Sequence, residues 1–184
     1  FGGIGCNFLN PALAGRAFLF SYPVIMTTWV APYTSLKLIG SNADAVTAAT
    51  PMSYLHQGML PDTSVMSSFL GSVGGCMGET SAVLLLLGGA YLLVRKVISA
   101  RIPVAYIATV AVIALLFPQG NDRLQWLGYQ VFSGGLMLGA IFMATDYATS
   151  PVTKGGQIVY GIGCGLITVF IRYFGSYAEG VSYA

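Results

Sequence analysis

Charged side chains are scarce in this sequence. Of its 184 residues, eight are Lys or Arg and six are Asp or Glu, a share of 8%, while 55% are hydrophobic. Soluble globular domains carry about 25% charged residues, so this composition excludes an ordinary water-exposed surface. The formal net charge of +2 is also too small to favour nucleic-acid binding, which depends on many phosphate contacts.

Cysteine and histidine are also few, and their positions exclude the common metal sites. The three cysteines are Cys6, Cys76 and Cys164, and no Cys-x-x-Cys pair occurs. This is not the ligand spacing of a zinc or iron–sulfur site, so we interpret the thiols as small packing groups. The single histidine, His56, lies in a predicted loop, where a solvated role is the simplest interpretation, and we leave it out of the predicted site.

Long apolar runs dominate what remains. The stretches without any charged residue are 80–94, 102–121, 124–145 and 155–171. Each approaches the roughly 20 residues with which an α-helix crosses about 30 Å of hydrocarbon. Because backbone groups in lipid must be hydrogen-bonded within their own segment, we expect these runs to be helices.

Glycine is abundant, and part of it is clustered within the apolar stretches. The clusters lie at 71–78, just before Glu79, and at 134–139. Because small residues let helix backbones approach closely, we interpret both clusters as positions of helix packing.

The runs predict an all-α polytopic membrane protein. Candidate spans are 11–29, an interrupted stretch over 65–94, then 103–117, 126–145 and 156–174. We expect residues 1–184 to form a single transmembrane domain. The chain begins with Phe1 and no initiator Met, and it ends as another apolar stretch begins, so we expect further helices on both sides.

A basic cluster predicts the orientation of the spans. Arg95, Lys96 and Arg101 lie in one short loop, which the positive-inside rule places in the cytoplasm. Counting onward, residues 118–125 lie outside and 146–154 inside, and the next loop, 174–179, lies outside again.

The long loop over residues 31–64 has two possible positions. If Val65–Met77 is a re-entrant half-helix, the loop lies outside. If that segment is a complete crossing, the loop lies inside, and hydropathy leaves both alternatives open.

Two short similarities suggest an internal repeat. The tetrapeptide Gly-Ile-Gly-Cys occurs at 3–6 and again at 161–164, and two predicted helix starts, Asn10-Pro11 and Ser150-Pro151, resemble each other. Asn or Ser before Pro is typical of a helix N-terminus, and half-helices related by inverted repeats occur in transporters. With 24 glycines in the chain, chance is an equally open explanation.

The long loop contains the segment Asp44-Ala45-Val46-Thr47-Ala48-Ala49-Thr50-Pro51. From its chemistry alone, an ordinary Thr-rich loop is the more common interpretation. The alternative is a modification site, because a Thr hydroxyl among alanines is easily reached by a modifying enzyme.

This segment resembles the flavinylation motif of the D subunit of the Rnf electron-transport complex and of the related B subunit of the sodium-pumping NADH:quinone reductase. In that family the closing Thr carries FMN through a phosphoester. The matching positions are Asp44, Thr47, Ala49 and the modified Thr50, while Ala48 stands where Gly is usual. Three other stretches resemble the same family, and the second of them is closer to Rnf than to the reductase: Gly78–Ser81, Met143–Pro151 and Glu179–Ala184.

The resemblance implies a function and a fold. It implies a flavoprotein relay between ferredoxin and NAD, coupled to Na⁺ or H⁺ translocation, with the flavin loop on the outer side of the bacterial plasma membrane. The implied partners are the other Rnf subunits (A, B, C, E and G), a flavin transferase and membrane lipid. The implied fold is a helix bundle with half-helices and inverted repeats, similar to urea transporters. The related family also implies riboflavin as a second flavin.

Glu79, Thr80 and Asp146 are polar residues near the ends of the predicted spans. Acids inside membranes are costly and are treated as functional candidates, so these residues are candidates for contact with the flavin or for ion coupling. Interfacial helix caps are the alternative, since acids are favoured at helix N-termini.

A solute channel or carrier on the same scaffold is the hypothesis from a different class. It would make Glu79 and Asp146 pathway residues and leave Thr50 unmodified. Solute flux without partner subunits would favour it, because one fold hosts many functions.

Overall fold

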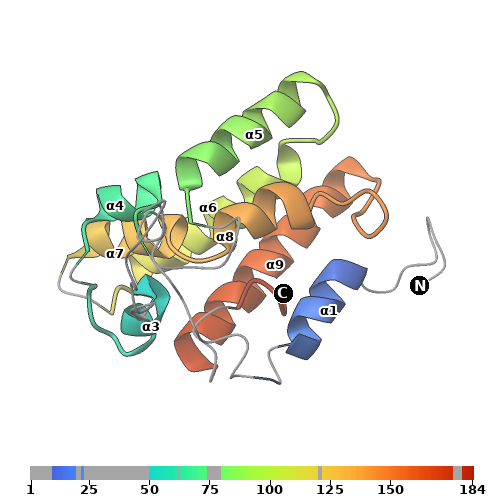
Figure 1. Ribbon diagram of the computed structural model, residues 1–184. Coiled ribbons are helices and arrows are strands. Elements are labelled where there is room, and N and C mark those ends of the chain that lie inside the picture. Colours follow the sequence, from blue (N-terminus) through green and yellow to red (C-terminus); the bar gives the residue numbers. More distant parts are fainter. Residues whose placement is uncertain are drawn as a thin grey trace.

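The computed structural model describes residues 10–19, 22, 50–61, 63–73, 80–119, 122–175 and 180–184 (Figure 1). Its elements in chain order are α1 (Pro11–Leu19), α3 (Pro51–His56), α4 (Val65–Leu70), α5 (Ala82–Val94), α6 (Arg101–Leu116), α7 (Arg123–Phe132), α8 (Leu136–Leu138), the π-helix η1 (Gly139–Met143) and α9 (Lys154–Phe174). These ranges contain helices and turns but no strand. The all-α prediction is therefore confirmed for the described part of the chain.

Helices α6 and α9 form a parallel pair at the centre of the fold. Residues that come later in α9 contact residues that come later in α6, so the two helices run in the same direction. An ideal Cβ on Gly161 would stand 2.9 Å from the Ala105 Cβ, and one on Gly165 would stand 2.7 Å from the Thr109 Cβ. Small residues four apart on one helix let two backbones approach closely. The spacing Gly161–Gly165 therefore sets how near the two helices lie.

A buried hydrogen bond continues the same seam. The Tyr106 and Thr168 hydroxyls are 2.5 Å apart, and both side chains are buried. Around them lies the largest apolar core of the described residues, whose buried members include Ile102, Val110, Leu136 and Ala140. The pair thus combines close packing with a polar contact that fixes its register.

The segment over 126–145 is not one straight helix, contrary to the prediction. Helix α7 ends at Phe132, and the axis bends by 57° before the α8–η1 segment. Ser133 is extended and Gly134 has a φ of +72°, a conformation that glycine adopts at little cost. Gly134 therefore supplies the bend, a role that was not predicted from the sequence.

The described residues of the interrupted stretch, 65–73 and 80–94, contain two helices. Helix α4 has six residues and α5 has thirteen. Gly71, in the left-handed conformation after α4, lies against Ser81, the N-cap of α5, since a Cβ there would be 2.8 Å from the Ser81 Cβ. The end of α4 and the start of α5 therefore lie side by side.

The two predicted helix starts have different outcomes. The Asn10 side chain accepts hydrogen bonds from the backbone N–H groups of Ala12 and Leu13 at 3.0 and 3.4 Å, so the predicted N-cap is confirmed. The prediction at Ser150 is wrong, because α9 begins at Lys154 with Thr153 as its N-cap. The two starts are thus not equivalent, and the first Gly-Ile-Gly-Cys lies outside the described residues.

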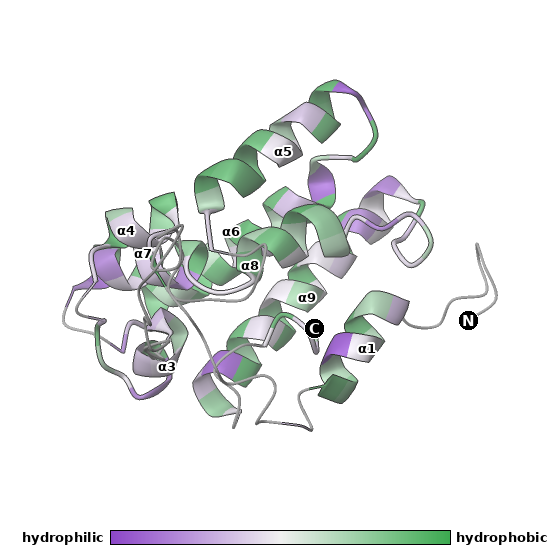
Figure 2. Cartoon of the chain, viewed as in Figure 1, coloured by the Kyte–Doolittle hydropathy of each residue, from purple (hydrophilic) through white to green (hydrophobic). Residues whose placement is uncertain are grey.

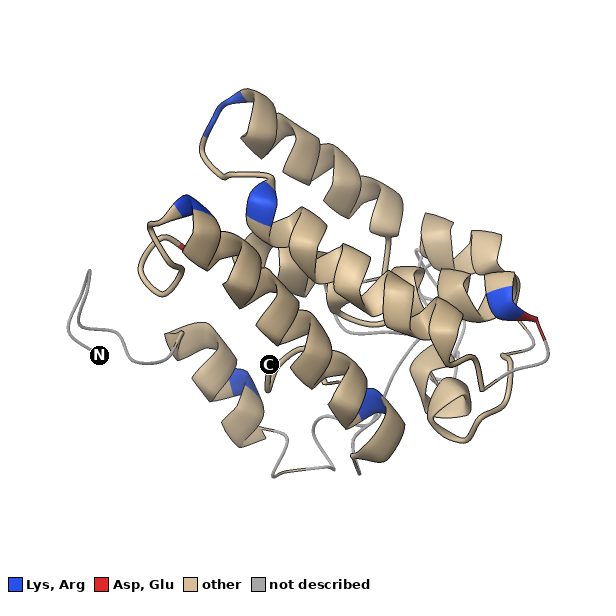
Figure 3. Cartoon of the chain, turned by 180° about the vertical axis from the view of Figure 1, so that it is seen from behind, with Lys and Arg blue, Asp and Glu red and all other residues tan. Residues whose placement is uncertain are grey.

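The pair α6–α9 has two distinct ends. At one end Gln157 accepts hydrogen bonds from Ser99 and Arg101 at 3.0 and 3.4 Å, which brings the basic loop to the start of α9. In Figure 3, several of the segments coloured for Lys and Arg lie at this end of the pair. At the other end His56 contacts Arg172. Gln157 and Arg172 are 15 residues apart on α9, so these two contacts lie roughly 22 Å apart along the helix. Loops 95–101 and 146–154 therefore share one end, opposite α3.

Hydrophobic residues make up much of the length of the helices (Figure 2). On α5 the outward face carries Leu84, Leu87, Tyr91 and Val94, each at least 63% exposed. Among the described helices, α9 is the one whose length and composition suit a membrane crossing, and the bent pair α7 to η1 is a second candidate if it forms one span. Large exposed apolar patches mark surfaces that meet lipid or another part of a protein.

Candidate functional site

Thr50 stands immediately before α3, at the end of the fold opposite the basic loop. It is the N-cap of that helix, with φ −70° and ψ 150°. The following residue, Pro51, restricts Thr50 to this extended region and occupies the first helical position, where its missing N–H costs nothing. The sequence Thr-Pro thus fixes the backbone at the predicted attachment residue.

The Thr50 hydroxyl is available for chemistry. Its side chain is partly exposed and makes no capping hydrogen bond. The adjacent Ser53 instead bonds the Thr50 carbonyl twice, through its backbone N–H at 2.9 Å and its hydroxyl at 2.7 Å. The backbone of Thr50 is therefore held, while its Oγ1 makes no hydrogen bond with the residues that the structure describes, which suits a residue that carries a covalent group.

The short helix α3 is seated on an apolar platform. Met52 and Leu55 are 3% and 2% exposed, and they pack with Ala114, Trp126 and Tyr129. The Tyr129 hydroxyl also donates to the Thr63 carbonyl, which ties the segment after α3 to α7. A helix of six residues is too short to be stable alone, so this platform determines where Thr50 lies.

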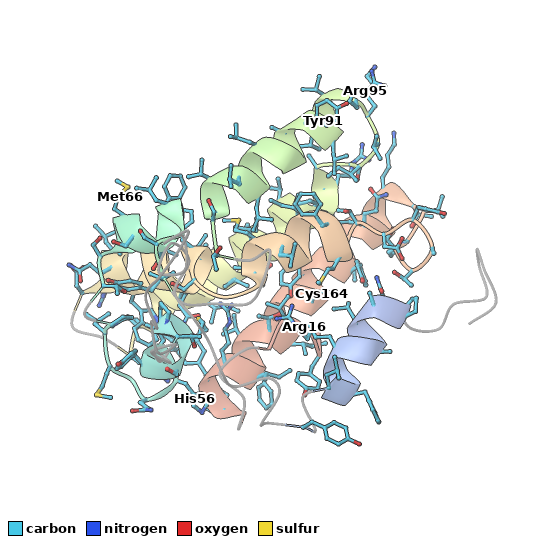
Figure 4. The ribbon with its side chains drawn as sticks, viewed as in Figure 1. Arg16, His56, Met66, Tyr91, Arg95 and Cys164 are labelled. Atoms are coloured by element: carbon cyan, nitrogen blue, oxygen red, sulfur yellow. The ribbon has the colours of Figure 1, made fainter. Side chains whose placement is uncertain are left out.

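His56, at the C-terminal end of α3, contacts the last turn of α9 (Figure 4). Its Nδ1 lies 3.3 Å from the carbonyl oxygen of Arg172. A carbonyl only accepts hydrogen bonds, so the His56 Nδ1 must carry the hydrogen. The Arg172 side chain turns inward, is 4% exposed, and donates from Nη1 to the Gln130 main-chain and side-chain oxygens at 2.7 and 3.1 Å.

A second series of hydrogen bonds lies at the same end of the fold. The Trp126 Nε1 donates to the Tyr173 hydroxyl at 2.9 Å, and that hydroxyl donates to the Phe117 carbonyl at 3.0 Å. Trp126 is fully buried, so its indole N–H requires this partner. The two series of hydrogen bonds connect α7 with the C-terminal ends of α6 and α9, next to α3.

The other predicted site residues are not gathered at Thr50 by the described structure. Asp44, Thr47, Ala49 and Glu79 lie outside the described residues. Thr80 is half-buried just before α5, beside the end of α4.

Asp146 lies between η1 and α9, towards the basic end. Its carboxylate accepts from the Thr149 hydroxyl at 3.4 Å, and its carbonyl accepts from the Ser150 N–H at 2.9 Å. These contacts are those of a turn-capping residue.

Comparison with known proteins covers the whole chain. Residues 1–184 match the NQR2, RnfD, RnfE family. The chain belongs to this family. It is 50% identical over 187 residues to the D subunit of the Na⁺-translocating ferredoxin:NAD⁺ oxidoreductase complex of Acetobacterium woodii, covering 100% of this chain and 55% of that protein.

Two further family members show the range of the similarity. The D subunit of the proton-translocating ferredoxin:NAD⁺ oxidoreductase complex of Clostridium ljungdahlii is 44% identical, with 100% of this chain and 57% of that protein covered. The B subunit of the Na⁺-translocating NADH-quinone reductase of Chromohalobacter salexigens is 37% identical, with 100% and 46% covered. The chain therefore spans about half the length of these family members.

Sequence reasoning missed the residues that hold α3 in this family member. His56 is exposed, as predicted, but the sequence did not indicate that its ring also contacts the Arg172 carbonyl, and Arg172 and Gln130 were not singled out. One signal was available, because Arg172 interrupts an otherwise apolar span, and an ionisable residue there is a functional candidate by default. Its partner Gln130 is 42 residues away, and no local pattern identifies it.

Proposed function

We propose that this chain is the flavin-bearing part of the D subunit of an Rnf-type complex, with FMN joined to Thr50 through a phosphoester. Three observations support the proposal. The segment Asp44–Pro51 resembles the flavinylation motif, and the relatives with 50% and 44% identity are named as D subunits of ferredoxin:NAD⁺ oxidoreductases. Thr50 also combines a fixed backbone with a partly exposed hydroxyl that makes no hydrogen bond among the described residues. The last observation carries the proposal.

The residues at Thr50 fit this group chemically. To form a phosphoester, the Thr oxygen would attack a flavin phosphate, lose its proton and displace the group already bound to that phosphorus. A separate flavin transferase would supply the base and the flavin donor, so the step needs a hydroxyl that an enzyme can reach but no neighbouring base. Bound FMN would supply redox chemistry to the site. The chain's own contribution is to hold the attachment point still, through Pro51, Ser53 and the platform under Met52 and Leu55.

The proposed setting is a bacterial plasma membrane. The exposed apolar faces of α5, α6 and α9 would meet lipid or the remaining helices of the protein, as parts of a single polytopic transmembrane domain. If the end with Arg95, Lys96 and Arg101 is cytoplasmic, α3 lies on the outer side, because it occupies the opposite end of α9. The urea-transporter-like inverted repeat and a second flavin such as riboflavin belong to the same proposal.

The proposed role within the complex is electron relay coupled to Na⁺ or H⁺ movement between ferredoxin and NAD⁺. The partners would be the other subunits of the complex, A, B, C, E and G. The B subunit of an NADH-quinone reductase is the close alternative, since one such relative is 37% identical. The higher identity to D subunits favours the Rnf assignment.

In-gel flavin fluorescence of the full-length protein, co-expressed with a flavin transferase, tests the attachment. We expect a fluorescent band in the unmodified protein and in Thr63→Ala, which removes an exposed hydroxyl of the same loop. Thr50→Ala should abolish the fluorescence. Fluorescence that survives in Thr50→Ala would place the flavin elsewhere, and a dark unmodified protein would contradict the flavoprotein assignment.

A further inference from the structure

His56 lies at a position where its hydrogen bond joins two elements that are otherwise distant in the sequence. The ring belongs to the last residue of α3, and the acceptor belongs to residue 172, 116 positions later. Arg172 falls in the last four residues of α9, whose carbonyls have no N–H donor inside the helix. A donor from outside the helix is therefore stabilising there, and His is well suited to this position.

The acceptor itself is held rigidly. The guanidinium of Arg172 is buried and bonds both oxygens of Gln130 on α7. Burying an arginine costs several kcal/mol of desolvation before its contacts offset this cost. The position of Arg172 is therefore strongly specified, and its carbonyl is a fixed point to which α3 is attached.

The apolar contacts of α3 leave one movement open. Met52 and Leu55 hold the helix against Trp126 and Tyr129, but apolar packing is not directional. A hydrogen bond at the C-terminal end of α3 removes the freedom to pivot on this platform. Because α3 is one rigid short helix, a constraint at His56 also fixes Thr50 at its other end.

We propose that His56 is a positioning residue for the flavin-bearing helix, which it locks to the C-terminal turn of α9 through the carbonyl of Arg172. The role of His56 in electron relay rests on the proposed function. If FMN is attached to Thr50, the position of Thr50 determines the distance from the flavin to the next redox centre. The docking of α3 itself does not depend on whether Thr50 carries FMN.

Three variants of the full-length protein separate the hydrogen bond from other effects. His56→Leu removes the donor at similar bulk. His56→Asn retains an amide N–H close to the position of Nδ1 and serves as the conservative rescue. Gln57→Ala changes the next, exposed residue of the same turn and is the matched control.

Hydrogen exchange in the flavin-free protein is the first measurement. The amides of Gln57, Gly58 and Met59 bond to carbonyls of the last turn of α3, so their exchange reports opening of this turn. We expect about fivefold faster exchange in His56→Leu, the change that one ordinary hydrogen bond produces in a local opening equilibrium. His56→Asn and Gln57→Ala should exchange as the unmodified protein does after correction for intrinsic rates.

Flavin fluorescence anisotropy in the flavinylated protein is the second measurement. We expect it to fall in His56→Leu and to be retained in His56→Asn and Gln57→Ala. Unchanged exchange in His56→Leu would overturn the lock whether or not FMN is present. Faster exchange with unchanged anisotropy would overturn the positioning role, and loss of flavin from the unmodified protein would count against the proposed function alone.

Discussion

The two ends of α9 hold their arginines in opposite ways. Near its start, Arg101 is exposed and makes one long hydrogen bond of 3.4 Å to Gln157. In its last turn, Arg172 is buried and bonds Gln130 at 2.7 and 3.1 Å. The proposed membrane orientation accounts for an exposed arginine at the basic end, whereas a buried arginine needs specific partners. The comparison separates the end whose charges we propose to orient the chain from the end that contains the candidate site.

Substitution of each arginine in turn should give the largest difference in stability between the two ends. Arg172→Met should lower the free energy of unfolding by about 2–3 kcal/mol, because two hydrogen bonds from a charged group are lost in a buried setting. Arg101→Met should change it by less than about 0.5 kcal/mol. The measurement is denaturant unfolding of the detergent-solubilised full-length protein. A more stable Arg172→Met would show that desolvation outweighs the bonds to Gln130.

The seam between the two ends is sensitive to a single methyl group. Gly165→Ala should cost about 2 kcal/mol of unfolding free energy, because the new Cβ would meet the Thr109 Cβ at 2.7 Å and the Tyr106 carbonyl at 3.1 Å. Gly163→Ala, two residues away, meets nothing within 4 Å and should stabilise the helix by up to about 1 kcal/mol. Equal effects in thermal unfolding would contradict the parallel packing of α6 on α9.

The Trp126–Tyr173–Phe117 chain offers a smaller test of the Thr50 end. Tyr173→Phe leaves the buried Trp126 N–H without its acceptor and should cost about 1–2 kcal/mol. Tyr147→Phe removes the hydroxyl of a tyrosine that is 75% exposed and should change stability by no more than about 0.5 kcal/mol. Tryptophan fluorescence during unfolding measures both. Equal changes in unfolding free energy for the two variants would mean that the hydrogen bonds of Tyr173 do not stabilise this end.

The basic end contains a backbone position that glycine would suit better. Lys96 has a φ of +56°, and the Val97 and Lys96 N–H groups bond the Leu92 and Leu93 carbonyls, as in a Schellman cap where glycine is preferred. Lys96→Gly should therefore raise stability by about 0.5–1 kcal/mol, and Lys96→Ala, which removes the charge but keeps the strain, should not. Equal gains in thermal unfolding would trace the effect to charge repulsion with Arg95.

Much of the helical framework follows from local sequence. The predicted spans 103–117 and 156–174 match α6 and α9 to within two residues at each end. Asn10 before Pro11 identifies the start of α1. The bend after Phe132 was missed because Gly134 and Gly135 suit close packing as well as a positive φ, and only the tertiary arrangement selects between them.

Less of the candidate site than of the helical framework can be predicted from the sequence. Thr50 can be selected through the motif around it, and Thr-Pro predicts its extended backbone. The residues that hold α3 cannot be selected, because His56 meets Arg172 and Arg172 meets Gln130 across 116 and 42 positions. Such pairs depend on how α3, α7 and α9 come together. The Ser150 prediction failed for a related reason, since Thr153 competes for the same helix start.

Mass spectrometry of the Thr50-containing peptide tests the central claim most directly. The peptide should come from the full-length protein, produced in cells that contain the flavin transferase. The account predicts a mass increase equal to one FMN less one water, with fragmentation locating it on Thr50 and not on Thr47. An unmodified Thr50 in a protein that is otherwise intact would contradict the claim.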